Sequence, residues 1–450
     1  ITSVGTLSAL TVAGNLSVNG GTIKLDGNYP TGSFNVALGD IALQSGSLSG
    51  GSNTAIGRGS LYNNTSGANN TGIGRGSLDA NTTASNNTAV GMNAMFANTT
   101  GTQNVAVGAI SLDANTTGDN NTALGYQALT ANTTAGGNTA LGSGAMITST
   151  TASGDTAVGA FAMLRTTTGS QNTAVGLSAM ENTTTGYNNT SVGWESMKAN
   201  TEGALNVAVG QQAMLANTTG DKNVCVGHNT LAANTTADNN TAIGDNALGA
   251  NTTGANNTAC GQAAFAACTT GSDNAALGTG AGLALTTGSN NLLLGHDAGR
   301  TGSPGGNITS GSNTIVLGDE NIGNAHIQVD WTVASDQRDK TDFTALDLGL
   351  DFVKALAPVT YKWDKRSKYG DKTADDYDLA AQTPDGTHKE DWLDIGFKAQ
   401  EVEALEIAAG YNKDNKTNLT TTLTEDGKQY GIQYSKFVPI LVKAIQEQNA

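Results

Sequence analysis

Glycines spaced 17 residues apart run through most of this chain. Fifteen of them keep this interval without a slip, while Gly39 precedes the first by 18 residues and Gly318 follows the last by 23. A fixed period of this length is typical of a solenoid, in which each repeat is one turn that buries its apolar face only against neighbouring turns. We therefore expect a mainly β fold, a β-solenoid or β-roll. The regular glycines are Gly57, Gly74, Gly91, Gly108, Gly125, Gly142, Gly159, Gly176, Gly193, Gly210, Gly227, Gly244, Gly261, Gly278 and Gly295.

The residues before each of these regularly spaced glycines, the lattice glycines, predict a short strand. The residue directly before it is apolar, as Val90 is, and the one before that is nearly always small, as Ala89 is. A sheet with one solvated face would alternate apolar and polar residues, so we expect both faces of this strand to be buried. One face can fill the turn, and we expect partner chains to cover the other in a homotrimer with the small residues nearest the axis. A monomeric solenoid is the alternative.

Asparagines recur at two fixed positions of the repeat. One lies four residues before the glycine, as Asn87 does, and one lies seven residues after it, as Asn98 does. We expect both sets to stack into ladders along the fibre.

Composition excludes several classes of protein. The 450 residues include 59 Gly but only 8 Phe and 4 Trp, which is too few aromatic residues for a large globular core. The net charge of −16 argues against a nucleic-acid partner. No apolar run reaches the roughly 18 residues that cross a bilayer, so we expect no membrane insertion. Cys225, Cys260 and Cys268 lack metal-ligand spacing and are interpreted as packed thiols, and we expect neither a metal nor a cofactor.

The order of segments predicts four parts. Residues 1–34 read as a β shaft segment, 35–300 as the solenoid, 301–334 as a β connector, and 335–450 as a separate small α+β domain. Within the connector, alternation from Ile327 to Val333 predicts a half-buried strand. Because Ile1 is no initiator methionine, we expect the chain to be a fragment of a longer protein.

The residue after each lattice glycine varies from repeat to repeat, which indicates an outward-facing position. Tyr126 and Trp194 occupy it and are weak candidates for binding a receptor by stacking on its sugars. Single exposed aromatic residues are also common on ordinary surfaces.

The chain changes in composition at Ser335. The last 116 residues hold 36 of its 60 charged residues, which marks a domain boundary. The expected elements of this domain are helices over 346–356, 400–407 and 436–448, the last capped by Ser435, strands over 359–363, 395–397 and 430–434, and a charged loop over 366–390.

A serine and a lysine stand five residues apart at this boundary, in the motif from Ser335 to Lys340. A hydroxyl becomes a nucleophile when a base takes its proton, and a lysine of lowered pKa can be that base. From spacing alone a solvated charged turn is the better interpretation. However, the motif is followed by segments 356–361, 396–402 and 441–447, and residues 335–450 together resemble the endosialidase-type intramolecular chaperone domain of bacteriophage tail fibres and tailspikes.

This resemblance implies a self-processing trimerisation domain. It implies that Ser335 is the nucleophile, Lys340 its base, and Ala334–Ser335 the scissile bond. The activity would be at most that of a single-turnover self-cleaving peptidase, with no metabolic reaction. The repeats resemble, more loosely, the left-handed β-roll heads of trimeric autotransporter adhesins.

We therefore expect a trimeric viral tail fibre, assembled in the host cytoplasm, located in the virion and used for attachment to a host surface receptor or polysaccharide. Its missing N-terminal part would dock on other virion tail proteins. A bacterial or prophage-derived trimeric surface adhesin is the main alternative. An ice-binding solenoid is a remote one, because its threonines would form a flat array and not adjacent pairs at turns.

Overall fold

The computed structural model describes residues 34–449 except Gly46, Val329, Asp330, Thr332, Thr373, Asp375 and Asn415. The shaft segment expected over residues 1–34 lies outside this range apart from Phe34. The chain divides into two compact units, residues 1–168 and 169–450, and each is presented separately below.

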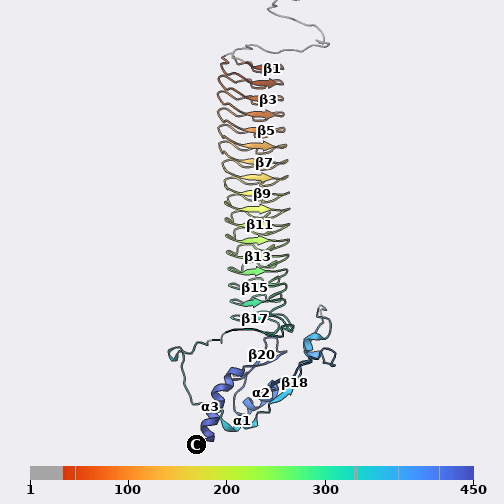
Figure 1. Ribbon diagram of the computed structural model, residues 1–450. Coiled ribbons are helices and arrows are strands. Elements are labelled where there is room, and N and C mark those ends of the chain that lie inside the picture. Colours follow the sequence, from red (N-terminus) through yellow and green to blue (C-terminus); the bar gives the residue numbers. More distant parts are fainter. Residues whose placement is uncertain are drawn as a thin grey trace, which may run out of the picture. The chain divides into compact units, whose positions relative to one another are not determined.

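The first unit is a parallel β-solenoid with one short strand per turn (Figure 1). Each strand ends directly before a lattice glycine and pairs in parallel with the strand of the next turn, so that Ala89 lies opposite Ala106. The glycine period therefore predicted this part of the fold correctly. The strands are β1 (Val36–Leu38), β2 (Thr54–Ile56), β3 (Thr71–Ile73), β4 (Thr88–Val90), β5 (Val105–Val107), β6 (Thr122–Leu124), β7 (Thr139–Leu141) and β8 (Thr156–Val158).

The second unit begins with the same architecture. Its parallel pairing runs past residue 300, because β16 pairs with β17 in register across the longer interval, Leu292 opposite Ile315. The six additional residues are accommodated in the loop between these two strands. The strands are β9 (Thr173–Val175), β10 (Thr190–Val192), β11 (Val207–Val209), β12 (Val224–Val226), β13 (Thr241–Ile243), β14 (Thr258–Cys260), β15 (Ala275–Leu277), β16 (Leu292–Leu294) and β17 (Ile315–Leu317).

The strands face the opposite way from the sequence expectation. The small middle residue, such as Ala123, is fully buried inside its own turn, whereas Leu124 beside it is 42% exposed. The small residues therefore do not point toward a shared axis. Alanine is the usual middle residue, and the interior also buries the larger side chains of Cys225, Leu293 and Val316 at this position. Larger side chains four residues after the glycine, such as Met95, fill the rest of the interior.

The lattice glycines are required by backbone conformation and by stacking. Gly91 has φ of +138°, and a Cβ there would lie 2.4 Å from the carbonyl oxygen of Gly108 in the next turn. A side chain would therefore meet rigid backbone in a region that L-residues rarely adopt.

Both asparagine ladders form, and both lie inside the turns. Asn87 Oδ1 accepts from the backbone N–H of Asn104 at 2.9 Å, and its Nδ2 donates to the carbonyl oxygen of Gly101 at 2.9 Å. In the second ladder, Asn98 Nδ2 donates to Asn81 Oδ1 at 3.0 Å. These side chains are fully buried, so their hydrogen bonds satisfy polar groups that water cannot reach.

The second ladder is interrupted where serine replaces asparagine at position 149. Among the described residues, Asn132 Oδ1 and Ser149 Oγ are buried without a hydrogen-bond partner. We expect Ser149→Asn to restore the donor to Asn132 and to raise the free energy of unfolding by roughly 1–2 kcal/mol, because it pairs a buried unsatisfied acceptor. Chemical denaturation of the variant checks this, with Ser143→Asn at an exposed position as the control. Equal denaturation midpoints for the two variants would contradict the interpretation that Asn132 Oδ1 lacks a donor.

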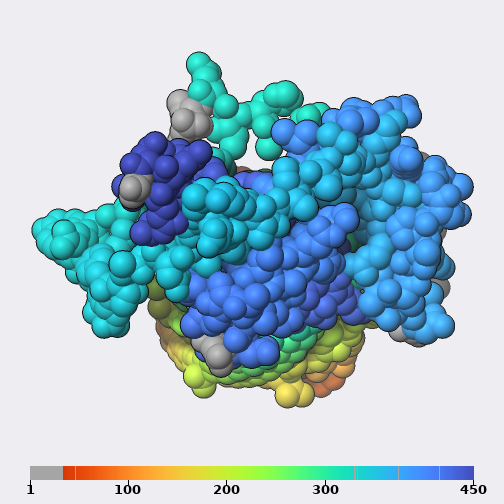
Figure 2. Space-filling model, turned by 90° about the horizontal axis from the view of Figure 1, so that it is seen from below, coloured from red at the N-terminus to blue at the C-terminus, as the bar shows by residue number. Residues whose placement is uncertain are grey.

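The remainder of the second unit is the small α+β region, as expected. Its core consists of Leu348, Phe352, Val402, Phe437 and Ile440. The residues of α3, dark blue in Figure 2, lie at the surface of this region. The elements are the 3₁₀ turns η1 (Gln337–Asp339), η2 (Arg366–Lys368), η3 (Leu379–Ala381) and η4 (Tyr434–Lys436), the helices α1 (Leu350–Ala355), α2 (Ala399–Ala408) and α3 (Phe437–Gln448), and the antiparallel pairs β18 (Val359–Tyr361) with β19 (Asp394–Gly396) and β20 (Thr421–Leu423) with β21 (Tyr430–Ile432).

Three expectations for this region need correction. Ser435 does not cap the last helix, because it lies within η4, and α3 begins after Lys436 without a side-chain cap. Strand β20 was missed, because its threonines resemble the turn threonines of the repeats. The strand expected from Ile327 to Val333 is not formed in the described part of that stretch, where Ile327, Trp331 and Val333 are exposed. Alternation predicts a half-buried strand, but no strand of the described chain pairs with this segment.

Candidate functional site at the domain boundary

The serine and lysine of the boundary motif lie in contact. Lys340 Nζ donates to Ser335 Oγ at 2.5 Å and to the Ser335 carbonyl oxygen at 3.3 Å. The short turn η1 folds the chain back between them, which brings residues five apart in sequence within hydrogen-bond distance. Ala334, Ser335 and Lys340 are all exposed.

Asp336 and Arg338 hold this turn. Asp336 Oδ1 accepts from the backbone N–H of Arg338 at 2.9 Å, and its carboxylate also pairs with the Arg338 guanidinium at 2.6 Å. The side-chain hydrogen bond from Arg338 is the largest of the effects that hold the pKa of Asp336 below its usual value. Asp336 and Arg338 thus hold the turn that brings Ser335 and Lys340 together, which the sequence motif did not reveal.

The dyad has the contact that proton transfer needs. A hydroxyl oxygen next to an amine nitrogen can pass its proton to that nitrogen once the amine is deprotonated. Desolvation favours the neutral amine of a lysine, and the exposed position of Lys340 offers none within this single chain.

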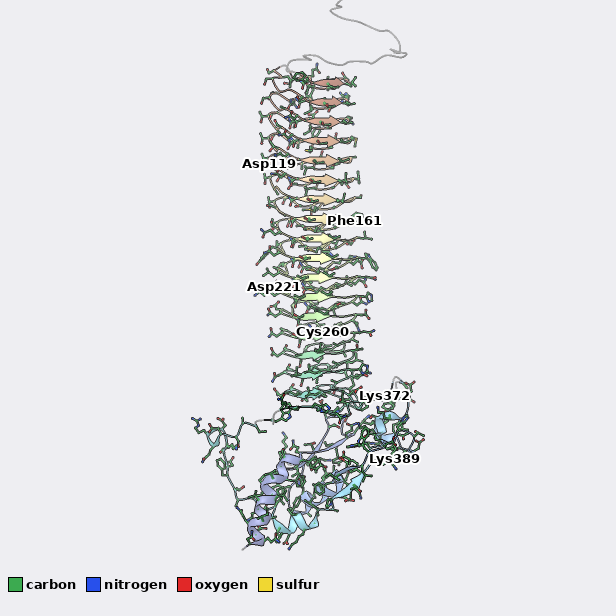
Figure 3. All side chains as sticks on the ribbon, viewed as in Figure 1. Asp119, Phe161, Asp221, Cys260, Lys372 and Lys389 are labelled. Carbon is green, nitrogen blue, oxygen red and sulfur yellow. The ribbon has the colours of Figure 1, made fainter. Side chains whose placement is uncertain are left out.

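The weak receptor candidates are exposed and lie in different units. Tyr126 is 53% and Trp194 is 46% exposed, each directly after a lattice glycine. The structure adds Phe161, which points away from its turn in Figure 3 and lies over Gly144, where a Cβ would be 2.9 Å from its ring. Phe161 lies two residues after a lattice glycine, at a position that also varies between repeats. That variation is the sequence signal that could have marked it as outward-facing.

The cysteines are packed thiols, as expected. Cys225 and Cys268 are buried and Cys260 is partly buried, and all three are free. Burial raises the pKa of the Cys225 thiol, and it raises that of Cys268 to about 11. Within the described residues, no group of three or more His, Cys, Asp or Glu side chains could hold a metal ion, and no helix has the length and apolarity needed to span a membrane.

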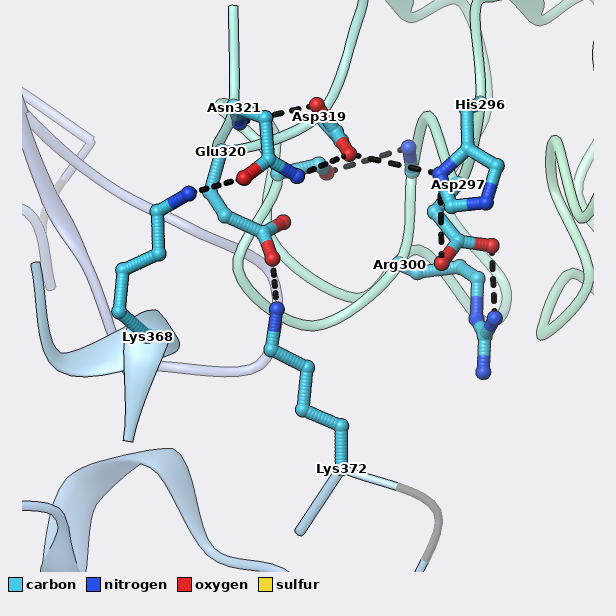
Figure 4. Close-up of polar contacts among 10 residues, drawn as sticks. His296, Asp297, Arg300, Asp319, Glu320, Asn321, Lys368 and Lys372 are labelled. Carbon is cyan, nitrogen blue, oxygen red and sulfur yellow. Dashed lines mark hydrogen bonds and ion pairs between the residues drawn. The ribbon is translucent and has the colours of Figure 1, made fainter. Parts of the chain in front are cut away.

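A polar network joins the last turn of the solenoid to the α+β region (Figure 4). Glu320, only 9% exposed, pairs with Lys372, and its carbonyl oxygen accepts from Lys365 Nζ at 2.9 Å. Lys368 Nζ donates to Asn321 Oδ1. At a second contact, Asp426 Oδ2 accepts from the backbone N–H of Asn307 at 3.1 Å. Sequence reasoning did not identify either contact.

Acidification should weaken this junction. Burial alone would raise the pKa of Asp426, but hydrogen bonds from Thr424, Asn307 and Lys428 outweigh it, so the pKa lies below its ordinary value of 3.8. A carboxyl group whose pKa is lowered by folding stabilises the folded state when ionised, fully above about pH 4, and loses that effect as pH falls through the folded pKa.

Thermal unfolding at about pH 7, pH 5 and pH 3 measures this loss of stability. We expect the midpoint temperature to fall mainly between about pH 5 and about pH 3. Asp426→Asn should show a smaller decline over that interval than the wild type. An equal decline would remove Asp426 from this role.

Comparison with known proteins agrees with the boundary motif. Residues 335–411 match the family model of the chaperone of endosialidase. Neither the curated proteins nor the solved structures gave a match. The matched segment starts at the serine of the dyad and contains α1, α2 and the β18–β19 pair. Residues 335–411 are thus similar to the chaperone of endosialidase, and they follow a parallel β-solenoid in the same chain.

Proposed function

We propose that three copies of this chain form a bacteriophage tail fibre that attaches the virion to its host, and that the C-terminal domain is its intramolecular chaperone. The observation that carries this proposal is the family match that begins at Ser335, directly downstream of a solenoid of near-identical turns. Such turns can pair one repeat out of register at little cost, since every side chain still meets its counterpart. A domain that trimerises first would set the register of the whole fibre.

Two exposed apolar surfaces support a homotrimer. The residues directly before the lattice glycines form an apolar ribbon in each unit, and the outer face of α3 is also apolar. Exposed apolar patches of this kind mark interaction surfaces. The ribbon contains Leu38, Ile56, Ile73, Leu124 and Leu141 in the first unit and Val175, Val192, Val226, Ile243, Leu277 and Leu317 in the second, and the face of α3 contains Val438, Leu441, Val442 and Ile445.

In this proposal the dyad cuts the chain once. Ser335 Oγ attacks the carbonyl carbon of Ala334 while its proton passes to Lys340 Nζ, and the peptide C–N bond breaks as the nitrogen of Ser335 takes up a proton. Water then hydrolyses the resulting ester, which leaves a carboxylate on Ala334 and a free amino group on Ser335. Covering of the exposed dyad by partner chains would supply the desolvation that Lys340 needs.

Imaging and mass spectrometry of purified virions test the location. The tail-fibre proposal requires the chain in the virion and at the contact with host cells. Recovery of the chain only from a bacterial envelope would support a trimeric surface adhesin instead.

A further inference from the structure

In the last turn of a β-solenoid, the backbone N–H groups have no following turn whose carbonyl oxygens could accept their hydrogen bonds. Inside the second unit, the N–H groups of Thr201, Glu202 and Gly203 donate to the carbonyl oxygen of Thr218 one turn further on, at 3.0 to 3.2 Å. The hydroxyl of Thr201 donates to the same oxygen at 3.1 Å. The last turn repeats this segment as Thr309, Ser310 and Gly311, since Thr286 donates to the Thr309 carbonyl oxygen in the same way.

A glutamate takes the place of the missing carbonyl. Glu425 Oε1 accepts from the N–H of Ser310 at 3.1 Å, and Oε2 accepts from the N–H of Gly311 at 3.0 Å. The hydroxyls of Thr309 and Ser310 donate to Oε1 at 3.4 and 3.0 Å. One carboxylate therefore reproduces the acceptor that a following threonine provides in the inner turns.

An aspartate reproduces a second acceptor. In the inner turns the N–H two residues before this segment, that of Ala199, donates to the carbonyl oxygen of Leu215 at 3.0 Å. The equivalent N–H in the last turn belongs to Asn307, and it donates to Asp426 Oδ2 at 3.1 Å. Two neighbouring carboxylates thus occupy the positions of two carbonyl groups of a further turn.

The hairpin that presents these carboxylates is preorganised. Asp426 Oδ1 accepts from Thr424 Oγ1 at 2.5 Å and from the N–H of Lys428 at 3.1 Å. The base of the hairpin is bound by Glu406, which is 1% exposed and accepts from Thr420 Oγ1 at 2.8 Å. The tip also lies close against the last turn, where a Cβ on Gly311 would be 2.3 Å from Glu425 Oε2.

We propose that the tip of the β20–β21 hairpin is a mimic of a solenoid turn, and that the chaperone domain uses it as the template on which the last turn of the solenoid folds. Hydrogen bonds to a carboxylate are stronger than those to a carbonyl group, so the template binds this turn before its neighbours can add their own contacts. The same contact covers an open sheet end that would otherwise pair with other chains. Neither step requires cleavage or a particular host.

The test uses the full chain with Ser335→Ala, so that the domain stays attached whether or not the wild type is cleaved. We expect Glu425→Ala to reduce the hydrogen-exchange protection of the Ser310 and Gly311 amides by about tenfold or more, since it removes their charge-assisted hydrogen bonds. Amides of residues 201–203 should keep their protection. Refolding from denaturant should yield several times less protease-resistant solenoid. Glu401→Ala, which removes an exposed carboxylate of α2, is the control.

A second variant leaves the chaperone domain unchanged. Gly311→Ala should displace Glu425 and cause the same two losses, whereas Gly323→Ala, where a Cβ meets nothing within 4 Å, should cause neither. Protection of the Leu419 and Thr420 amides, which Glu406 binds, reports that the domain itself is folded. Wild-type protection of the Ser310 and Gly311 amides in either variant overturns the turn mimic. Lost protection with an unchanged refolding yield overturns its role as a template.

Discussion

Ser335→Ala should leave the chain intact where the wild type yields two fragments, the smaller beginning at Ser335. The variant removes the oxygen that lies 2.5 Å from Lys340 Nζ, and no other hydroxyl group lies next to the Ala334 carbonyl in this motif. Lys340→Ala should have the same effect, because the serine then lacks its base. Mass spectrometry of the purified chains measures the outcome directly.

Arg338→Ala should slow cleavage without abolishing it, because it removes only the support of the turn between Ser335 and Lys340. The uncleaved variants should still trimerise, yet lose their heat-resistant trimer more readily, since an attached chaperone domain keeps a route back from the assembled state. An intact wild-type chain would show that the domain is a permanent cap, and cleavage in Ser335→Ala would exclude Ser335 as the nucleophile.

Aspartates in the apolar ribbon should abolish the trimer. In Leu124→Asp combined with Leu141→Asp, three chains would bring six carboxylates into one apolar interface, and each unpaired buried charge costs several kcal/mol. Both leucines are about two-fifths exposed in the single chain, so the solenoid itself should still fold. Sedimentation velocity is expected to show a trimer for the wild type and a monomer for the variant.

The control variant also introduces two aspartates, but at exposed polar positions outside the apolar ribbon. Gln103→Asp combined with Ser143→Asp should remain trimeric, because both positions are exposed and polar. A trimeric leucine variant would show that the ribbon is not the interface. A monomeric wild type would exclude the trimer altogether and favour a single solenoid with a solvated apolar ribbon.

The sequence predicted the repeat correctly because the chemistry of each turn is local. The glycine of each turn must approach the next backbone within a distance that no Cβ allows, so its period appears directly in the sequence. The asparagines were equally visible, since buried amides are the side chains that satisfy a backbone N–H and a carbonyl group together, as Asn87 does. The spacing of Ser335 and Lys340 alone favoured a solvated turn, and only the resemblance to a known domain pointed to the contact that the structure shows.

The direction in which each strand faces could not be predicted from the same pattern. Alanine and leucine alternate in either orientation, and only the closed turn shows that Ala123 lies inside and Leu124 outside. Met95 has a φ of +52°, which an L-residue avoids in isolation and which the stacking of turns imposes. Ser435 failed as a cap because η4 takes up the residues before α3, a local competition that capping preference alone does not resolve.

The contacts between residues distant in sequence required the tertiary structure. Glu425 and Ser310 are 115 residues apart, and nothing in either local sequence indicates that a carboxylate replaces a carbonyl group of the next turn. The sequence by itself determined the period, the ladders and the boundary at Ser335, because each depends on composition or on exact repetition. The orientation of the strands and the cap on the last turn were decided only when the closed turn and the folded hairpin fixed which groups meet, since burial and pairing depend on distance in space.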